Sequence, residues 1–212
     1  MEPRLSAIAL SGDVGLVALF LLTANLLLGL LISVRYSPWR FWPHKRINIF
    51  RIHNQTGFAA LAACILHPIL LLFSRRAGFD WLDIMFPAWA PRQPTINLLG
   101  AVGVYTLGFV LITSHYRVEL GRRRWKTLHF STYLLAGAIF VHSLLTDPHL
   151  NGTPFQPVDG GKLFVEGCIL IVTAAVWLRV RHARRKSRAM APAPAKENLE
   201  TLTEETTTEG TL

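Results

Sequence analysis

Long apolar blocks alternate with short polar stretches along this 212-residue chain. Five blocks reach the roughly 20 residues that an α-helix needs to cross a bilayer at about 1.5 Å rise per residue. They cover residues 13–34, 49–73, 96–115, 127–146 and 162–180. The pattern predicts an all-α membrane protein, a polytopic bundle of about five transmembrane helices.

Lysine and arginine are concentrated in every second connection between these blocks. The connections after the first and third blocks and the segment after the fifth block carry five, five and seven of the 22 basic residues. Basic residues stay on the cytoplasmic side of membrane helices, so this asymmetry predicts an N-terminus outside and a cytoplasmic C-terminus. Nucleic-acid binding would explain the formal charge of +9 but not the apolar blocks, so no nucleic-acid partner is expected.

The blocks divide the chain into three parts. We expect an N-terminal segment over residues 1–12, a transmembrane domain over 13–182, and a basic, then disordered cytoplasmic tail over 183–212. The first block is too long for a signal-peptide core and is interpreted as a retained helix. Residues 75–95 contain Trp81 and Trp89 and are interpreted as an interfacial segment on the outer surface.

Two of the blocks carry paired histidines. His53 and His67 are fourteen residues apart in the second block, and His129 and His142 are thirteen apart in the fourth. Both blocks cross in the same direction, so His53 and His129 share an inner level, and the other two share an outer level roughly 20 Å away. Histidine is costly inside a bilayer and marks functional sites there. One imidazole from each of two facing helices is the arrangement that ligates a haem iron on both sides.

The spacing of the second pair does not suit a straight helix. Fourteen positions return nearly to the same helix face, whereas thirteen leave His142 about 140° away from the face of His129. Either this helix bends or the two sites differ in azimuth. Small residues between the histidines, such as Gly57 and Ala60, leave room for a flat macrocycle, although small residues also serve close helix packing.

Two longer motifs surround the histidines. The first, RIHNQTGFAALAACILHP, contains Arg51, His53, Gly57 and His67; the second, TSHYRVELGRRRWKTLHFSTYLLAGAIFVH, contains Leu120, Gly121, Trp125, His129, Tyr133 and His142. Through these motifs, residues 13–180 resemble the ferric-reductase-like transmembrane domain shared by ferric reductases and NADPH oxidases. The chain is also similar to the haem-binding membrane subunit that serves periplasmic methionine sulfoxide reductases.

The resemblance implies two non-covalent haem b groups, one between His53 and His129 and one between His67 and His142. It supports His142 more than helical geometry does. Arg51 and Trp125 are each within about one turn of an inner histidine, which makes them candidates for a haem contact, and Gly57 is a candidate for the haem slot. The methionine-sulfoxide-reductase subunits lack a counterpart of His53, so four histidines favour the two-haem branch. Many family members have a further N-terminal helix that is not seen here.

The resemblance also defines the expected activity. The flavin and nicotinamide domains of NADPH oxidases and many ferric reductases are not found in this sequence, so flavin and NAD(P)H are expected only through a separate partner. We expect a transmembrane b-type cytochrome in a bacterial inner membrane, without catalytic side chains of its own. Its donor would be a flavoprotein or a quinol, and its acceptor ferric iron, oxygen or a periplasmic protein. The alternatives are a haem-binding subunit that reduces a periplasmic partner enzyme, and a non-haem transporter or sensor.

The remaining histidines and cysteines have simpler interpretations. His44 is expected in solvent, His115 at the membrane interface and His182 in a cationic cluster facing lipid headgroups. His149, with Asp147 and Asp159, is a weak candidate for binding a metal substrate. Cys64 and Cys168 are interpreted as small apolar residues, because no C-x-x-C-H motif for covalent haem attachment is present.

Overall fold

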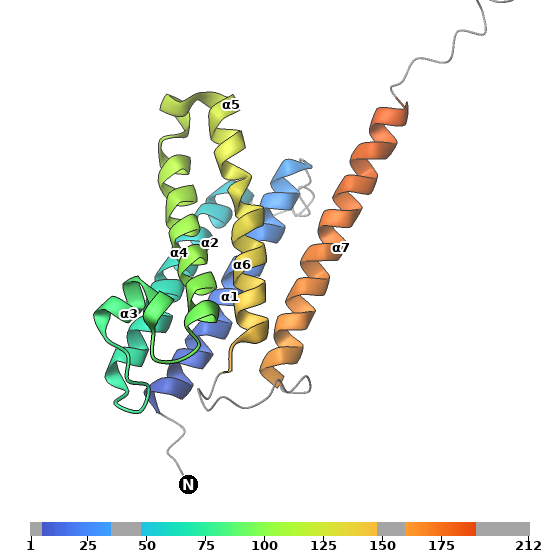
Figure 1. Cartoon of the computed structure of the whole chain (residues 1–212). Helices are drawn as coiled ribbons and strands as arrows, with labels where there is room; N and C mark the ends of the chain where they lie inside the picture. Colours follow the sequence, from blue (N-terminus) through green and yellow to red (C-terminus); the bar gives the residue numbers. More distant parts are fainter. Residues whose placement is uncertain (1–5, 35–47, 148–159, 190–212) are drawn as a thin grey trace, which may run out of the picture. The chain divides into compact units, whose positions relative to one another are not determined.

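The computed structural model describes residues 6–34, 48–147 and 160–189, and the regular elements in these ranges are all helices (Figure 1). Five helical segments among the described residues are long and apolar enough to cross a membrane. The predicted all-α class and the number of spans are therefore confirmed. The predicted sites of His44 and His149, and the tail from residue 190 onward, lie outside these ranges.

Each predicted block corresponds to one of the five long helical segments, and their ends differ from the predicted ones by up to about ten residues. The helices are α1 (Ala7–Ser33), α2 (Ile49–Ile69) with its 3₁₀ extension η1 (Leu70–Phe73), α3 (Trp81–Met85), η2 (Pro87–Trp89), α4 (Pro94–His115), α5 (Arg117–His129), α6 (Ser131–Leu145) and α7 (Gly160–Ala189). α1 begins before the predicted boundary because the hydroxyl of Ser6 accepts a hydrogen bond from the backbone N–H of Ala9, 3.2 Å away, and caps the first turn.

The largest difference from the predicted blocks concerns the fourth span. The prediction begins at residue 127, but the helical segment covers Arg117–Leu145, because the charged stretch before residue 127 forms α5 instead of a loop. Within α5, Gly121 has φ 73° and ψ 155°, a backbone conformation open to glycine and strained for other residues. A second irregularity, at Phe130, separates α5 from α6.

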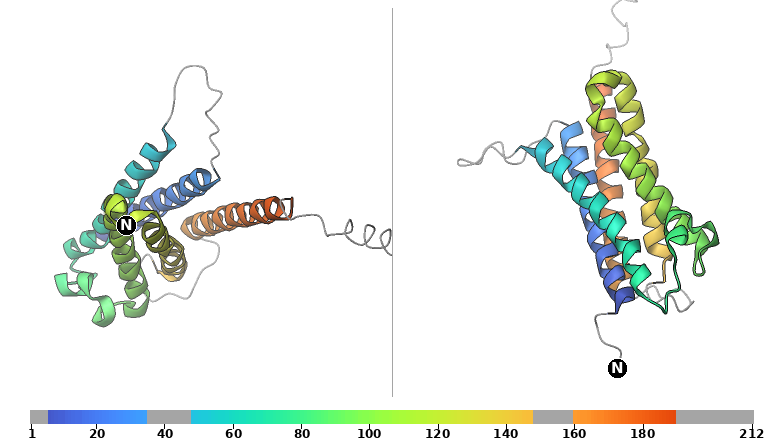
Figure 2. Two further views of the ribbon diagram at one scale, coloured as in Figure 1. Left: turned by 90° about the horizontal axis from the view of Figure 1, so that it is seen from above. Right: turned by 90° about the vertical axis from the view of Figure 1, so that its left-hand side faces the viewer.

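Two helix pairs make the core of the first compact unit, residues 1–175. α1 packs along α2, and α4 packs along α6, as the two views of Figure 2 show. Buried aliphatic side chains of these helices form the core, among them Leu19, Ala60 and Leu107. The histidine-bearing helices α2, α5 and α6 are thus each packed against α1 or α4.

The segment between α2 and α4 is short and irregular. α3 begins with a capping box, in which the Asp83 side chain accepts from the backbone N–H of Asp80 at 2.9 Å. Ala77, Phe79 and Ala90 form a small buried cluster, while Trp81, Phe86 and Trp89 are exposed. Exposed aromatic side chains are typical of a membrane interface, and the interfacial location of this segment stays a prediction.

The second compact unit, residues 176–212, is described only as the end of α7. The helix continues to Ala189, so the first residues of the predicted tail are helical. In this portion the Arg181 guanidinium lies over the Trp177 ring, 5.1 Å from its centroid. His182, Arg184 and Arg185 are exposed there, and their role as a cationic cluster facing lipid headgroups stays a prediction.

Candidate functional site

The four histidines of the two motifs form two facing pairs. The ring centroids of His53 and His129 are 6.3 Å apart, with their planes at 71°. Those of His67 and His142 are 6.4 Å apart, with their planes at 75°. We call the first the inner pair and the second the outer pair, after the predicted orientation. The structure therefore brings together the residues that the sequence places at equal depth.

The separation within each pair suits one metal ion between two imidazoles. An imidazole nitrogen binds a transition metal at about 2.0–2.1 Å, and a five-membered ring has a radius of roughly 1.2 Å, so two coaxial ligands have centroids about 6.4 Å apart. Both observed separations match this value. Two histidines alone are too few for a zinc-type site, and the described residues contain no cluster of three or more His, Cys, Asp or Glu that could hold a metal ion.

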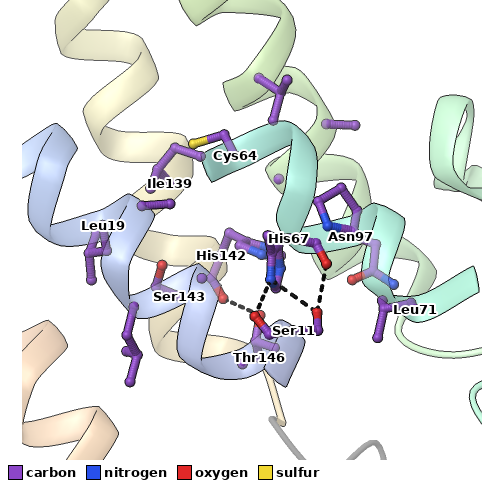
Figure 3. Close-up of a pocket in the computed structure, with 18 of the residues that line it drawn as sticks. Ser11, Leu19, Cys64, His67, Leu71, Asn97, Ile139, His142, Ser143 and Thr146 are labelled. Atoms are coloured by element: carbon purple, nitrogen blue, oxygen red, sulfur yellow. Dashed lines mark hydrogen bonds between the residues drawn. The ribbon is translucent and has the colours of Figure 1, made fainter. Parts of the chain in front are cut away.

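The outer pair is held by backbone carbonyls of neighbouring helices (Figure 3). The Nδ1–H of His67 donates to the Ser11 carbonyl of α1 at 2.7 Å, and the Ser11 hydroxyl donates back to the His67 carbonyl at 2.8 Å. The Nδ1–H of His142 donates to the Ile96 carbonyl of α4 at 2.8 Å. Each ring is thus tied to the helix that lies behind it.

A cavity of about 450 Å³ lies beside the outer pair. Both histidine rings line it, along with apolar side chains such as Leu19 and Ile139. Lys162, which is buried, also lines it and donates from Nζ to the Leu144 and Thr146 carbonyls at the end of α6. An apolar wall with a few polar groups is the usual lining of a cofactor pocket.

The inner pair is held in two different ways. The Nδ1–H of His53 donates to the Asn25 carbonyl of α1 at 3.1 Å. His129 has instead a side-chain partner, because its Nδ1 lies 3.5 Å from the Ser114 hydroxyl of α4. The Trp125 indole N–H donates to the same hydroxyl at 3.3 Å, and the Trp125 and His129 rings are 5.2 Å apart.

A glycine lies against three of the four rings. A Cβ atom added to Gly15 would be 3.0 Å from Nδ1 of His67, and one added to Gly29 would be 3.3 Å from Cε1 of His53. One added to Gly100 would be 2.9 Å from Cε1 of His142. Each glycine is four residues after the carbonyl that accepts the Nδ1–H bond, and we call this combination a glycine–carbonyl pair. The missing side chain lets the imidazole reach the backbone.

These bonds determine which ring nitrogen can bind a metal. A carbonyl oxygen can only accept, so Nδ1 carries the proton in His53, His67 and His142. In the neutral imidazole the other nitrogen, Nε2, is then unprotonated and has a free lone pair. A metal-ligating histidine typically has this outer-shell arrangement.

The irregularity at Phe130 contributes to the azimuth of His142. The Phe130 N–H bonds the carbonyls of both Lys126 and Thr127, and the Tyr133 N–H bonds the Phe130 carbonyl at 3.1 Å. This is a 3₁₀-type turn, which rotates about 20° more per residue than an α-helix. The extra rotation is in the direction that His142 needs to face the same side as His129. A three-residue turn of this kind adds about 60° of the roughly 140° required, so the irregular helix explains part of the spacing.

The other predicted site residues have different surroundings. Trp125 lies beside the inner pair, as described. Gly57 is buried, and a Cβ atom there would meet Leu111 at 3.3 Å and Asn25 at 3.4 Å. Arg51 is exposed near the start of α2, and its backbone N–H bonds the Asn48 side chain. His115 is exposed and its ring meets that of Tyr116. The roles predicted for Arg51, Gly57 and Trp125 stay predictions.

Comparison with protein-family models identifies the family of this chain. The model for the ferric reductase like transmembrane component matches residues 14–140, more than half of the chain. The chain belongs to this family. No curated protein and no solved structure matched it. Ferric-reductase-like domains generally bind haem, and the chain is an integral membrane protein suited to electron transfer.

The matched region of this ferric-reductase-like protein ends before its last candidate ligand. His53, His67 and His129 lie inside residues 14–140, and His142 lies two residues beyond them. The pairing of His142 with His67 therefore rests on the 6.4 Å separation of their ring centroids.

Sequence reasoning missed the residues behind the histidines. Ser11 and Asn25 of α1 are fourteen residues apart, as are Gly15 and Gly29, and this equals the spacing of the α2 histidines. Gly100 and Ser114 of α4 are again fourteen residues apart. This shared period was a signal in the sequence, but only the paired helices show which residues it joins.

Proposed function

We propose that the protein is a transmembrane b-type cytochrome with two bis-histidine haems, which carries electrons from a cytoplasmic or membrane donor to an acceptor outside. The observation that carries this proposal is the pair of imidazole–imidazole separations, 6.3 and 6.4 Å, at two levels of one helical bundle. Family membership supports a haem-binding role. Bound haem supplies a one-electron Fe(III)/Fe(II) couple at each level.

The side chains of this protein hold and insulate the sites. His53 and His129 would hold one iron, and His67 and His142 the other, each through Nε2. With one imidazole from each of two helices as ligands, a bound haem would supply electron transfer and not a site for oxygen or substrate. Leu19, Ala60 and Leu107 belong to the buried aliphatic core of the bundle, and such a core would insulate the two sites from water.

Donor and acceptor follow from the chemistry and the orientation. The electron donor is a separate flavoprotein, itself reduced by NAD(P)H, or a membrane quinol. The acceptor is ferric iron, oxygen or a periplasmic protein. With basic connections on the inner side, the protein resides in the inner membrane of a bacterium with its C-terminus in the cytoplasm.

The first experiment is a haem count on the purified protein in detergent. We expect a b-type reduced-minus-oxidised spectrum and two haems per chain in a pyridine haemochromogen assay. Protein made with ample haem that showed no Soret band would contradict the proposal and favour a non-haem transporter or sensor.

Single histidine variants test the pairing itself. His67→Ala should lose the outer haem and keep the inner one, and His53→Ala should do the reverse, so each variant should contain one haem per chain with a different midpoint potential. His115→Ala is the matched control, because this exposed histidine belongs to neither pair, and it should keep two haems. Two haems in His67→Ala would show that the pairing is wrong.

A further inference from the structure

The Nδ1 partner of His129 differs from the backbone carbonyls that the other three histidines share, although Nδ1 of His67 also lies 3.1 Å from the Ser11 hydroxyl. His53, His67 and His142 each bond a backbone carbonyl and lie against a glycine four residues after it. At the equivalent position for His129, α4 has Ser114 instead of a glycine, and the carbonyl four residues earlier belongs to Val110. The fourth position therefore differs from the other three both in the residue that faces the ring and in the acceptor of the Nδ1 atom.

The Val110 carbonyl already has a side-chain partner. The buried Thr113 hydroxyl lies 3.1 Å from the Val110 carbonyl oxygen and 2.9 Å from the Phe109 carbonyl oxygen, and it shares its hydrogen between them. His129 instead has the Ser114 hydroxyl at 3.5 Å, a longer distance than the 2.7–3.1 Å of the three carbonyl bonds. Hydrogen bonds weaken with distance, so His129 has the weakest Nδ1 partner of the four.

Ser114 and its neighbour Trp125 have complementary hydrogen-bonding chemistry. A serine hydroxyl can donate or accept, so by itself it does not determine the tautomer of the facing imidazole. The Trp125 indole N–H can only donate, and it bonds the Ser114 oxygen at 3.3 Å. The Ser114 oxygen has two lone pairs, and the bond from Trp125 occupies one of them. This bond orients the hydroxyl and leaves one lone pair to accept from His129.

We propose that Ser114 and Trp125 are positioning residues that give His129 a weak, side-chain-built hydrogen bond in place of a carbonyl acceptor, so that the reduction potential of the inner haem lies above the value that a carbonyl acceptor would give. The inference rests on the proposed function, since it requires a haem between His53 and His129. A bond from Nδ1–H to a strong acceptor makes an imidazole a more basic ligand, and a more basic ligand favours Fe(III) over Fe(II). The weak bond at His129 therefore favours the reduced iron.

The test is a redox titration of the full-length protein in detergent, with the inner haem assigned in the His67→Ala background. Ser114→Ala removes the acceptor and should raise the potential of the inner haem further, leaving the outer one unchanged. Ser114→Thr keeps a hydroxyl and should restore the original potential. Thr106→Ala is the matched control, because that α4 hydroxyl bonds only the Val102 carbonyl of its own helix.

A second variant covers the case in which Ser114→Ala does not retain the inner haem. Trp125→Phe keeps the Ser114 hydroxyl but removes the N–H that occupies one of its lone pairs, so a stronger bond from His129 and a lower inner potential are expected. An unchanged inner potential in both variants, or an equal shift of both haems, would overturn the inference. Wild-type protein without two haems would instead contradict the proposed function, so the two failures are distinguishable.

Discussion

At the residue scale, the absence of a side chain is as important here as the presence of an imidazole. Gly15, Gly29 and Gly100 each leave a helix backbone bare at the point where a histidine ring meets it. The ring can then donate from Nδ1 to the carbonyl four residues earlier, which holds its orientation and leaves Nε2 unprotonated. A methyl group at these positions would separate the ring from its acceptor.

Gly100→Ala should remove the outer haem selectively. The new methyl group would lie 2.9 Å from Cε1 of His142 and about as close to its Nδ1, so the ring must move from the Ile96 carbonyl. Overpacking of this kind costs about 1–3 kcal/mol. We expect one haem per chain by pyridine haemochromogen and a lower thermal midpoint.

Glycines on the same helices provide the controls. A Cβ atom at Gly108 of α4 or at Gly12 of α1 would have no neighbour within 4 Å. Gly108→Ala should therefore keep both haems, and Gly12→Ala is the equivalent control for Gly15→Ala. A Gly100→Ala protein with two haems and an unaltered spectrum would argue against a role for the glycine–carbonyl pairs.

At the element scale, the irregular turn at Phe130 affects how far α6 is rotated relative to α5. The α4 positions that face the two histidines, Gly100 and Ser114, are fourteen residues apart and lie on one helix face. His129 and His142 are only thirteen apart, so a regular helix could not present both to α4. The 3₁₀-type turn supplies additional rotation between them.

An alanine inserted after Phe130 should abolish the outer pair. One extra residue turns α6 by about 100° and advances it by about 1.5 Å relative to α5, which takes His142 away from Gly100. We expect the inner haem to remain and the outer haem to be lost in the reduced-minus-oxidised spectrum.

The same insertion after Asp147 is the control, because it follows the end of α6 and leaves the spacing of the two histidines unchanged. Loss of both haems in the Phe130 insertion, with full retention in the control, would mean that this irregular turn serves the whole bundle and not the outer pair alone.

At the scale of the whole molecule, the charge distribution determines the predicted orientation. The connections after the first and third spans and the end of the chain hold most of the basic residues, which predicts the inner histidine pair on the cytoplasmic side. The direction of electron flow in the proposed function depends on this orientation.

Cysteine labelling in intact cells should report the orientation. The two native cysteines, Cys64 and Cys168, are buried, so a membrane-impermeant maleimide should react only with an introduced thiol. We expect Glu2→Cys to react in intact cells and Thr208→Cys to react only after permeabilisation. Each variant is the control for the other, and the reverse pattern would invert the proposed direction of transfer.

The sequence by itself determined the number of spans, their approximate ends and the two levels of histidine. This was possible because bilayer thickness requires long apolar runs and because depth along a helix is proportional to residue number. The resemblance in the two motifs also identified the family, which the comparison confirmed over residues 14–140.

Only the tertiary structure decided how each imidazole is oriented. The azimuth of His142 depends on a local turn at Phe130, and the partner of each Nδ1 atom depends on which helix packs behind it. These contacts join residues such as Ser11 and His67, or Ile96 and His142, that are far apart in the chain. The sequence contains a fourteen-residue period in α1 and α4. Only the packing of these helices against the histidines shows that the repeated positions contact the imidazole rings.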